Sequence, residues 1–203
     1  MLNLLHSSRK FFPDRSPIAP GKARTLIAWR IAIAALGFWV TVAPAATETA
    51  VIISELIQPA KLATLGMRGA NPRVQKCVYW LATARETKQN PTNVLDSAIV
   101  LAGYTNAPAA RLTRDALLRN LDIAEKLGCL DTDGLAEMRQ GKAPTIRSGP
   151  YRGDQLSVDH IIPRAVCPEL DNVIANLELL PMRMNSAKND RVGDRQLSLA
   201  SDS

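Results

Sequence analysis

Apolar positions recur every three or four residues through much of residues 50–140, and this spacing predicts a series of helices. The first covers residues 50–66 and ends at a glycine. A second begins at Asn71 and Pro72, because asparagine caps a helix and proline suits its first turn. Further helices are expected within residues 91–103, 111–128 and 131–141, each closed by a glycine.

The pattern changes after a loop rich in glycine and proline at residues 141–155. Alternating and β-branched residues in LSVDHII predict a strand that ends before Pro163. A loop with two prolines follows, then a short strand in NLELLP and a helix in MRMNSAKNDRV. The predicted fold class is α+β, with a mostly helical body at residues 47–145 and a small strand–strand–helix module at residues 146–203.

Composition supports a folded, largely helical chain. Apolar residues make up 46% of the 203 residues, which is enough for a core. Aromatic residues make up only 4%, and alanine is abundant, which favours helices over a β-sandwich. The net charge of +6 lies mainly in residues 1–45, which hold six cations and one anion. The remainder is almost neutral, so only local clusters of cations can attract phosphate there.

Residues 1–46 are predicted to be a signal peptide or a membrane anchor. A basic start precedes residues 31–47, which carry no charge, and the small residues at Ala43-Pro44-Ala45 are typical of a cleavage site. The remainder is therefore expected to be exported, either periplasmic or secreted, with membrane contact only through this segment. Two alternatives are a buried core helix and an uncleaved anchor, although the apolar run is short for a membrane span.

The three cysteines, Cys77, Cys129 and Cys167, form no C-x-x-C pair. Only one histidine follows the leader, which argues against a zinc site built from cysteine and histidine. Two interpretations stay open: one disulfide with a spare thiol if the chain is exported, or three small buried residues.

The candidate chemistry lies around SVDHIIPR, where Asp159 adjoins His160. Asn185 and Asn189 are one helical turn apart, so both amides can face one point. A carboxylate and amide oxygens, completed by water and a substrate phosphate, suit Mg²⁺ better than zinc. A histidine with an ordinary pKa of about 6.5 can accept a proton from water near neutral pH. Together these groups could hydrolyse a phosphodiester bond.

Strand geometry limits how the two neighbours can act together. Side chains of adjacent strand residues point to opposite faces. Asp159 and His160 can therefore serve one substrate only if they flank it from two sides, or if the strand twists or ends there.

Residues 156–195 resemble the motif of HNH (ββα-metal) endonucleases. In that family an Asp-His or His-His pair on the first strand is followed by an asparagine before the second strand and a histidine or asparagine on the helix. Here fifteen residues separate His160 from Asn176, and eight more separate Asn176 from Asn185. The resemblance covers about a fifth of the chain.

The resemblance implies a role for each residue of the motif. His160 would be the general base, and Asn176 would fix the loop that orients it. Asp159 and Asn185 would bind the metal, and Asn189 matches a second helical ligand in some members. Asparagine in place of the last histidine makes Mg²⁺ the expected metal, with Mn²⁺ as the alternative. Nucleic acid would be contacted by Lys188, Arg191 and Arg164.

The predicted function is metal-dependent cleavage of DNA, with RNA as an alternative substrate, leaving a 5′-phosphate as the resemblance implies. Two other functions stay open. The module could bind nucleic acid without cutting it, or the chain could be a structural protein of the cell envelope. The sequence does not identify an inhibitor protein.

Overall fold

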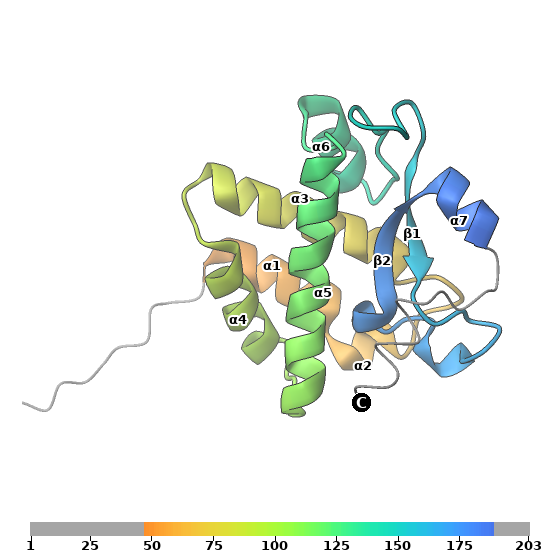
Figure 1. Cartoon of the computed structure of the whole chain (residues 1–203). Helices are drawn as coiled ribbons and strands as arrows, with labels where there is room; N and C mark the ends of the chain where they lie inside the picture. The colour runs from red at the N-terminus through yellow and green to blue at the C-terminus, as the bar shows by residue number, and fades with distance from the viewer. Residues whose placement is uncertain (1–46, 189–203) are drawn as a thin grey trace, which may run out of the picture. The chain divides into compact units, whose positions relative to one another are not determined.

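The computed structural model describes residues 47–188, so the predictions for the leader, for Asn189 and for Arg191 lie outside the described residues. All described residues belong to one compact unit. Its fold is α+β: helices precede a two-stranded antiparallel sheet and a last helix (Figure 1). The elements are α1 (Glu48–Ile57), α2 (Pro59–Leu62), α3 (Asn71–Glu86), α4 (Pro91–Leu101), α5 (Ala107–Lys126), α6 (Thr132–Arg139), β1 (Leu156–His160), η1 (Pro168–Leu170), η2 (Ile174–Asn176), β2 (Leu177–Pro181) and α7 (Met182–Lys188).

Each predicted helix corresponds to one helix of the structure, except the first, which is divided in two. The expected helix over residues 50–66 is divided into α1 and α2 at Pro59, which has no N–H to continue the α-helical ladder and clashes with the preceding turn. The capping role expected for Asn71 is wrong. Asn71 is the first residue of α3, and its side-chain amide donates instead to the carbonyl oxygen of Val158, 3.4 Å away.

One hydrophobic core runs through the described residues and includes both strands. Apolar side chains of α1, α3, α4 and α5 pack together with Leu156, Leu177 and Leu179 of the sheet. Ile146, in the loop that precedes β1, is fully buried in the same core. The helical region and the strands therefore fold as parts of one packed unit, without a separate core on either side of residue 146.

The pairing of β1 with β2 decides which side chains share a face. Leu156 lies opposite Pro181, Val158 opposite Leu179, and His160 opposite Leu177. Cross-strand partners lie on the same face, so these side chains line the face toward the core. The other face carries Ser157 and Asp159 on β1 with Glu178 and Leu180 on β2, and α7 packs against both strands.

The open edge of β2 is paired with a side chain of α5, which runs beside it in Figure 1. Asn120 is fully buried, donates through Nδ2 to the Leu177 carbonyl at 3.0 Å and accepts through Oδ1 from the Leu179 N–H at 2.8 Å. One asparagine thus replaces a third strand at this point.

The open edge of β1 is satisfied by α3, α7 and the preceding loop. Gln75 donates to the Leu156 carbonyl at 2.9 Å, next to the bond from Asn71 to the Val158 carbonyl. Lys188 donates to the next carbonyl on that edge, that of His160. Three successive outward carbonyls are therefore bound by three side chains, so the edge is not free to pair with another strand.

The three cysteines are free thiols, so the structure contains no disulfide among them. Cys77 and Cys129 are buried, and burial raises the pKa of each thiol to about 12. Cys167 is only partly buried, and its hydrogen bond to Glu169 raises the pKa of its thiol. All three are therefore protonated and weakly reactive near neutral pH.

No helix within residues 47–188 is long and apolar enough to cross a membrane.

Replacing Asn120 by Leu is expected to lower the free energy of unfolding by about 2–4 kcal/mol, because a buried carbonyl and a buried N–H of β2 lose their partner. Urea denaturation of the two proteins measures this difference. Asn93→Ala, at an exposed position of α4, is the matched control and should change stability by less than about 0.5 kcal/mol. Equal losses in both variants would contradict the edge role of Asn120.

Candidate functional site

The end of β1 and the last turn of α7 bring together four residues that the sequence analysis selected. Lys188 Nζ lies 2.5 Å from Asp159 Oδ2 and 2.5 Å from the carbonyl oxygen of His160. Asn185 Nδ2 donates to Ser157 Oγ at 3.2 Å. Ser157 and Asp159 lie two residues apart on one face of the strand, where they contact side chains three residues apart on the helix.

Asp159 and His160 lie on opposite sides of the strand end. The carboxylate points toward α7, while the imidazole lies on the core face, opposite Leu177. Both belong to the last residues of β1, beyond which the chain turns away. The two side chains therefore lie on opposite faces of β1, with the carboxylate toward α7 and the imidazole buried on the core face.

The imidazole of His160 is bound by Asp171. Its Nε2 lies 3.0 Å from the Asp171 carbonyl oxygen and 3.0 Å from Asp171 Oδ1, and only 7% of the histidine side chain is exposed. A carbonyl oxygen can only accept, so Nε2 carries the proton and Nδ1 is the basic nitrogen of the neutral ring. The Asp171 carboxylate lies beside the same ring nitrogen, within ion-pair distance.

Asp171 also connects this site to the helical region. Its Oδ2 accepts from the backbone N–H of Arg68 at 2.9 Å, in the loop before α3. Arg68 has a φ of 56°, a left-handed conformation that is uncommon for residues other than glycine. One buried carboxylate thus fixes both this turn and the histidine ring.

Asn176 binds the loop that follows His160. Its Oδ1 accepts from the Ile162 N–H at 2.8 Å, and its Nδ2 donates to the carbonyls of Ile162 and Leu170 at 3.0 and 3.2 Å. The side chain is buried and all of these partners are backbone groups. Asn176 therefore fixes the path of the chain on both sides of the loop and is not directed at a substrate.

Two further predicted residues, Arg164 and Asn185, have no hydrogen bond to Asp159 or to His160 among the described residues. Arg164 is exposed in the loop after Pro163, where it can reach solvent and a large ligand. Asn185 shares the α7 face with Lys188, but in this structure its amide nitrogen is used by Ser157.

The sequence analysis missed Asp171, Ser157 and Asp154. Asp171 lies within PELDN, eleven residues after the histidine, and no spacing rule joins residues across an irregular loop. Ser157 could have been found from its i, i+2 relation to Asp159. Asp154 anchors the start of α7, since its Oδ2 accepts from the Arg183 N–H at 2.9 Å.

Like charges face each other beside the candidate site. Asp159 and Glu178 are direct cross-strand partners on the α7 face. Two carboxylates in this relation repel each other unless cations compensate them. Lys188 lies on Asp159, and Arg119 of α5 lies 2.8 Å from Glu178. Each of the two carboxylates at this end of the sheet therefore has a cation beside it.

The donors present fit a hard divalent metal ion better than a zinc ion. Within residues 47–188, no three side chains of His, Cys, Asp or Glu gather closely enough to bind a metal by themselves. Asp159 Oδ2 and the His160 carbonyl oxygen both accept hydrogen bonds from the ammonium of Lys188. Carboxylate and carbonyl oxygens are ligand types that Mg²⁺ prefers.

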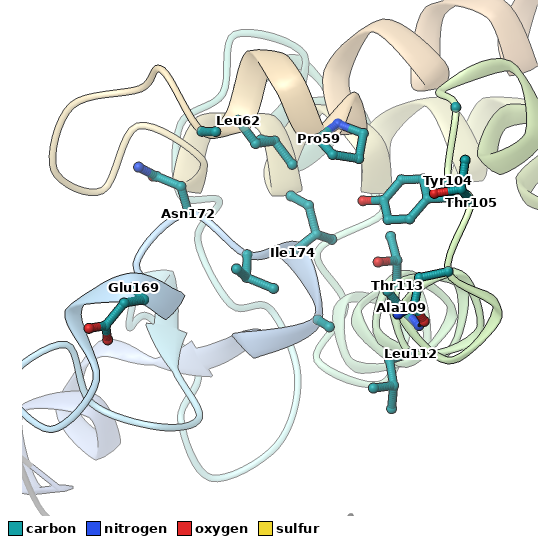
Figure 2. Close-up of a pocket in the computed structure, with 15 residues that line it drawn as sticks. Pro59, Leu62, Tyr104, Thr105, Ala109, Leu112, Thr113, Glu169, Asn172 and Ile174 are labelled. Atoms are coloured by element: carbon teal, nitrogen blue, oxygen red, sulfur yellow. The ribbon is translucent and has the colours of Figure 1, made fainter.

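Several hollows lie near these elements. The one of about 470 Å³ in Figure 2 lies between α2, the start of α5 and residues 169–175, and its walls are mainly apolar. The hydroxyl of Tyr104 in its wall already donates to the Ile57 carbonyl, so this hollow has few polar groups available for a reaction. A second hollow of about 300 Å³ adjoins Asn185 and Ser157 and is also lined by Arg68. This second hollow extends the candidate site toward the helical region.

Comparison of the chain with protein-family models, with curated proteins and with solved structures found no match. The geometry of the described residues is therefore the basis for the functional argument.

Protonation of Asp154 is expected to loosen α7. The hydrogen bond from the Arg183 backbone lowers the pKa of Asp154 below its usual 3.8. Because the folded pKa is the lower one, this stabilisation is complete above the unfolded value and is lost as the pH falls through the folded value. The stability difference between the wild-type protein and Asp154→Asn should be constant above about pH 5 and shrink in more acidic solution.

Urea denaturation of both proteins at a series of pH values measures this difference, with far-UV circular dichroism confirming that each is folded at the start. A difference that persists unchanged down to about pH 2 would show that the ionised form of Asp154 does not stabilise α7.

Proposed function

We propose that β1, β2 and α7 form a metal-dependent endonuclease site of the HNH type, which hydrolyses phosphodiester bonds in DNA. The main support is one observation: Asp159 and the His160 carbonyl both accept from the ammonium of Lys188, and the tautomer of the His160 ring is fixed by the Asp171 carbonyl. The resemblance of residues 156–195 to HNH endonucleases points to the same chemistry. RNA is the alternative substrate.

Asp159 and Asn185 would bind the metal, with Asn189 as a further candidate ligand and Mg²⁺ or Mn²⁺ as the expected ion. When bound, such an ion polarises a phosphate and stabilises the leaving oxygen. Asn185 could supply its amide oxygen, since within residues 47–188 its hydrogen bond to Ser157 uses the amide nitrogen.

His160 would act as the general base. Nδ1 accepts a proton from water as the water oxygen bonds to phosphorus, and the bond from phosphorus to the 3′ oxygen breaks. The products are a 5′-phosphate and a 3′-hydroxyl, the latter protonated from solvent. Asp171 orients the ring through Nε2 and stabilises the imidazolium that forms. Asn176 keeps the following loop, and so the ring, in position.

Substrate binding would depend on local cations, because the part of the chain after the leader is almost neutral. Arg164 is exposed in the loop after β1, and Lys188 lies in the last turn of α7 beside Asp159. Arg191 would add a third cation. Phosphate contacts of this kind position a duplex without reading its sequence. Export would separate the enzyme from the DNA of its own cell.

The test is cleavage of supercoiled plasmid with Mg²⁺, Mn²⁺ or a chelator. The wild-type protein should nick plasmid only with metal, and His160→Ala should lower the rate at least about a hundredfold, because the base is lost. His160→Gln keeps a donor within reach of the Asp171 carbonyl but is a much poorer base than imidazole, so it should be equally impaired. Asn93→Ala serves as the control and should cut normally.

Absence of cleavage by the wild-type protein with every divalent metal, together with retained binding of DNA, would favour a nucleic-acid-binding module without catalysis. Absence of both activities would favour a structural protein of the envelope.

A further inference from the structure

The side chain of Lys188 lies where a metal ion would be expected to bind. Its ammonium group is 2.5 Å from a carboxylate oxygen and 2.5 Å from a backbone carbonyl oxygen, both at the end of β1. The side chains of Lys188 and Asp159 are each only 15% exposed. Carboxylate and carbonyl oxygens are also the ligands that Mg²⁺ prefers, so the lysine and the metal compete for the same atoms.

We propose that Lys188 is an internal counter-cation that occupies the metal position in the metal-free protein, leaves Asp159 when a divalent ion binds, and then contacts a phosphate of the substrate. The inference rests on the proposed function, because it concerns the same site. It assigns Lys188 two successive partners, a carboxylate and a phosphate.

Charge makes the two cations mutually exclusive. Asp159 and Glu178 face each other across the sheet, Lys188 lies on Asp159, and Arg119 lies 2.8 Å from Glu178. A divalent ion added beside Lys188 would place two cations on the same carboxylate, and in a mostly buried site their repulsion is weakly screened. Removal of Lys188 from Asp159 relieves this repulsion.

The position of Lys188 on its helix permits the movement. The start of α7 is anchored by hydrogen bonds from Arg183 to Asp154 and from Met182 to the Gln155 carbonyl. Lys188 lies in the last turn, at the opposite end of this short helix. Its flexible four-carbon stem lets the ammonium move while the helix stays in place. A phosphate at the strand end then offers the ammonium a new anionic partner.

The experiment is a titration of the metal-free protein with Mn²⁺, in which the free ion is followed by electron paramagnetic resonance. Lys188→Met should bind Mn²⁺ about tenfold more tightly than the wild-type protein if Lys188 occupies the site about nine-tenths of the time. Arg183→Met removes an exposed cation from the same helix and should leave the affinity unchanged. Asp159→Asn should abolish binding.

Thermal unfolding provides an independent readout. Without metal, Lys188→Met should melt at a lower temperature than the wild-type protein, because Asp159 loses its partner. Added Mg²⁺ should raise its melting temperature more than that of the wild-type protein, because the ion binds it more tightly. Lys188→Gln retains hydrogen-bond donors without the charge and should also bind Mn²⁺ more tightly, which covers the case in which the methionine variant does not fold.

Plasmid cleavage by the same preparations separates the two proposals. Cleavage by the wild-type protein with unchanged or weaker Mn²⁺ affinity in both Lys188 variants would overturn the inference and leave the nuclease proposal standing. Tighter Mn²⁺ binding by the variants, without any cleavage by the wild-type protein, would support the proposed role of Lys188 and overturn the nuclease proposal. Absence of Mn²⁺ binding in every protein would overturn both.

Discussion

The described structure depends on how a sheet of only two strands is held within a helical protein. Such a sheet has two open edges, and it is marginally stable by itself. Here side-chain amides of two helices bind the edges: Asn120 of α5 on β2, and Gln75 of α3 on β1. Both amides lie in the interior, where an unpaired strand group would be costly. The polar groups of the core therefore set the register between helices and strands, while apolar packing supplies most of the stability.

This arrangement explains why the candidate site is at the end of β1 and nowhere else along it. The first outward carbonyls of the strand are bound by α3, and the last is bound by Lys188, which also contacts Asp159. The edge interactions change at this residue from side-chain amides of α3 to the ammonium of Lys188 on α7. If Lys188 leaves Asp159 as we propose, the bonds from α3 to the rest of the edge would remain.

The sequence predicted the regular elements well because helices and strands depend on local periodicity. The strand ending in Asp159-His160 and the helix after β2 follow from patterns within a few residues. The partners of these residues do not. Asp171 follows the short 3-10 helix η1 in an irregular loop, and Lys188 reaches Asp159 across 28 intervening residues. Asn71 was assigned a helix cap because local rules favour one, but tertiary contact with β1 uses its amide instead.

The bonds of Asp171 bear on whether the strand–strand–helix segment can work alone. One oxygen of its carboxylate lies beside the histidine ring and the other accepts from Arg68, which precedes α3. Asn172 adds bonds to the same turn, to the Ala70 N–H and the Leu65 carbonyl. The orientation of the ring is therefore determined jointly by the loop after β1 and by a turn at Arg68, 103 residues before Asp171. Without that turn the carboxylate would lose a fixed donor and the ring a fixed partner, so the helical region is part of the site's geometry and more than an attached body.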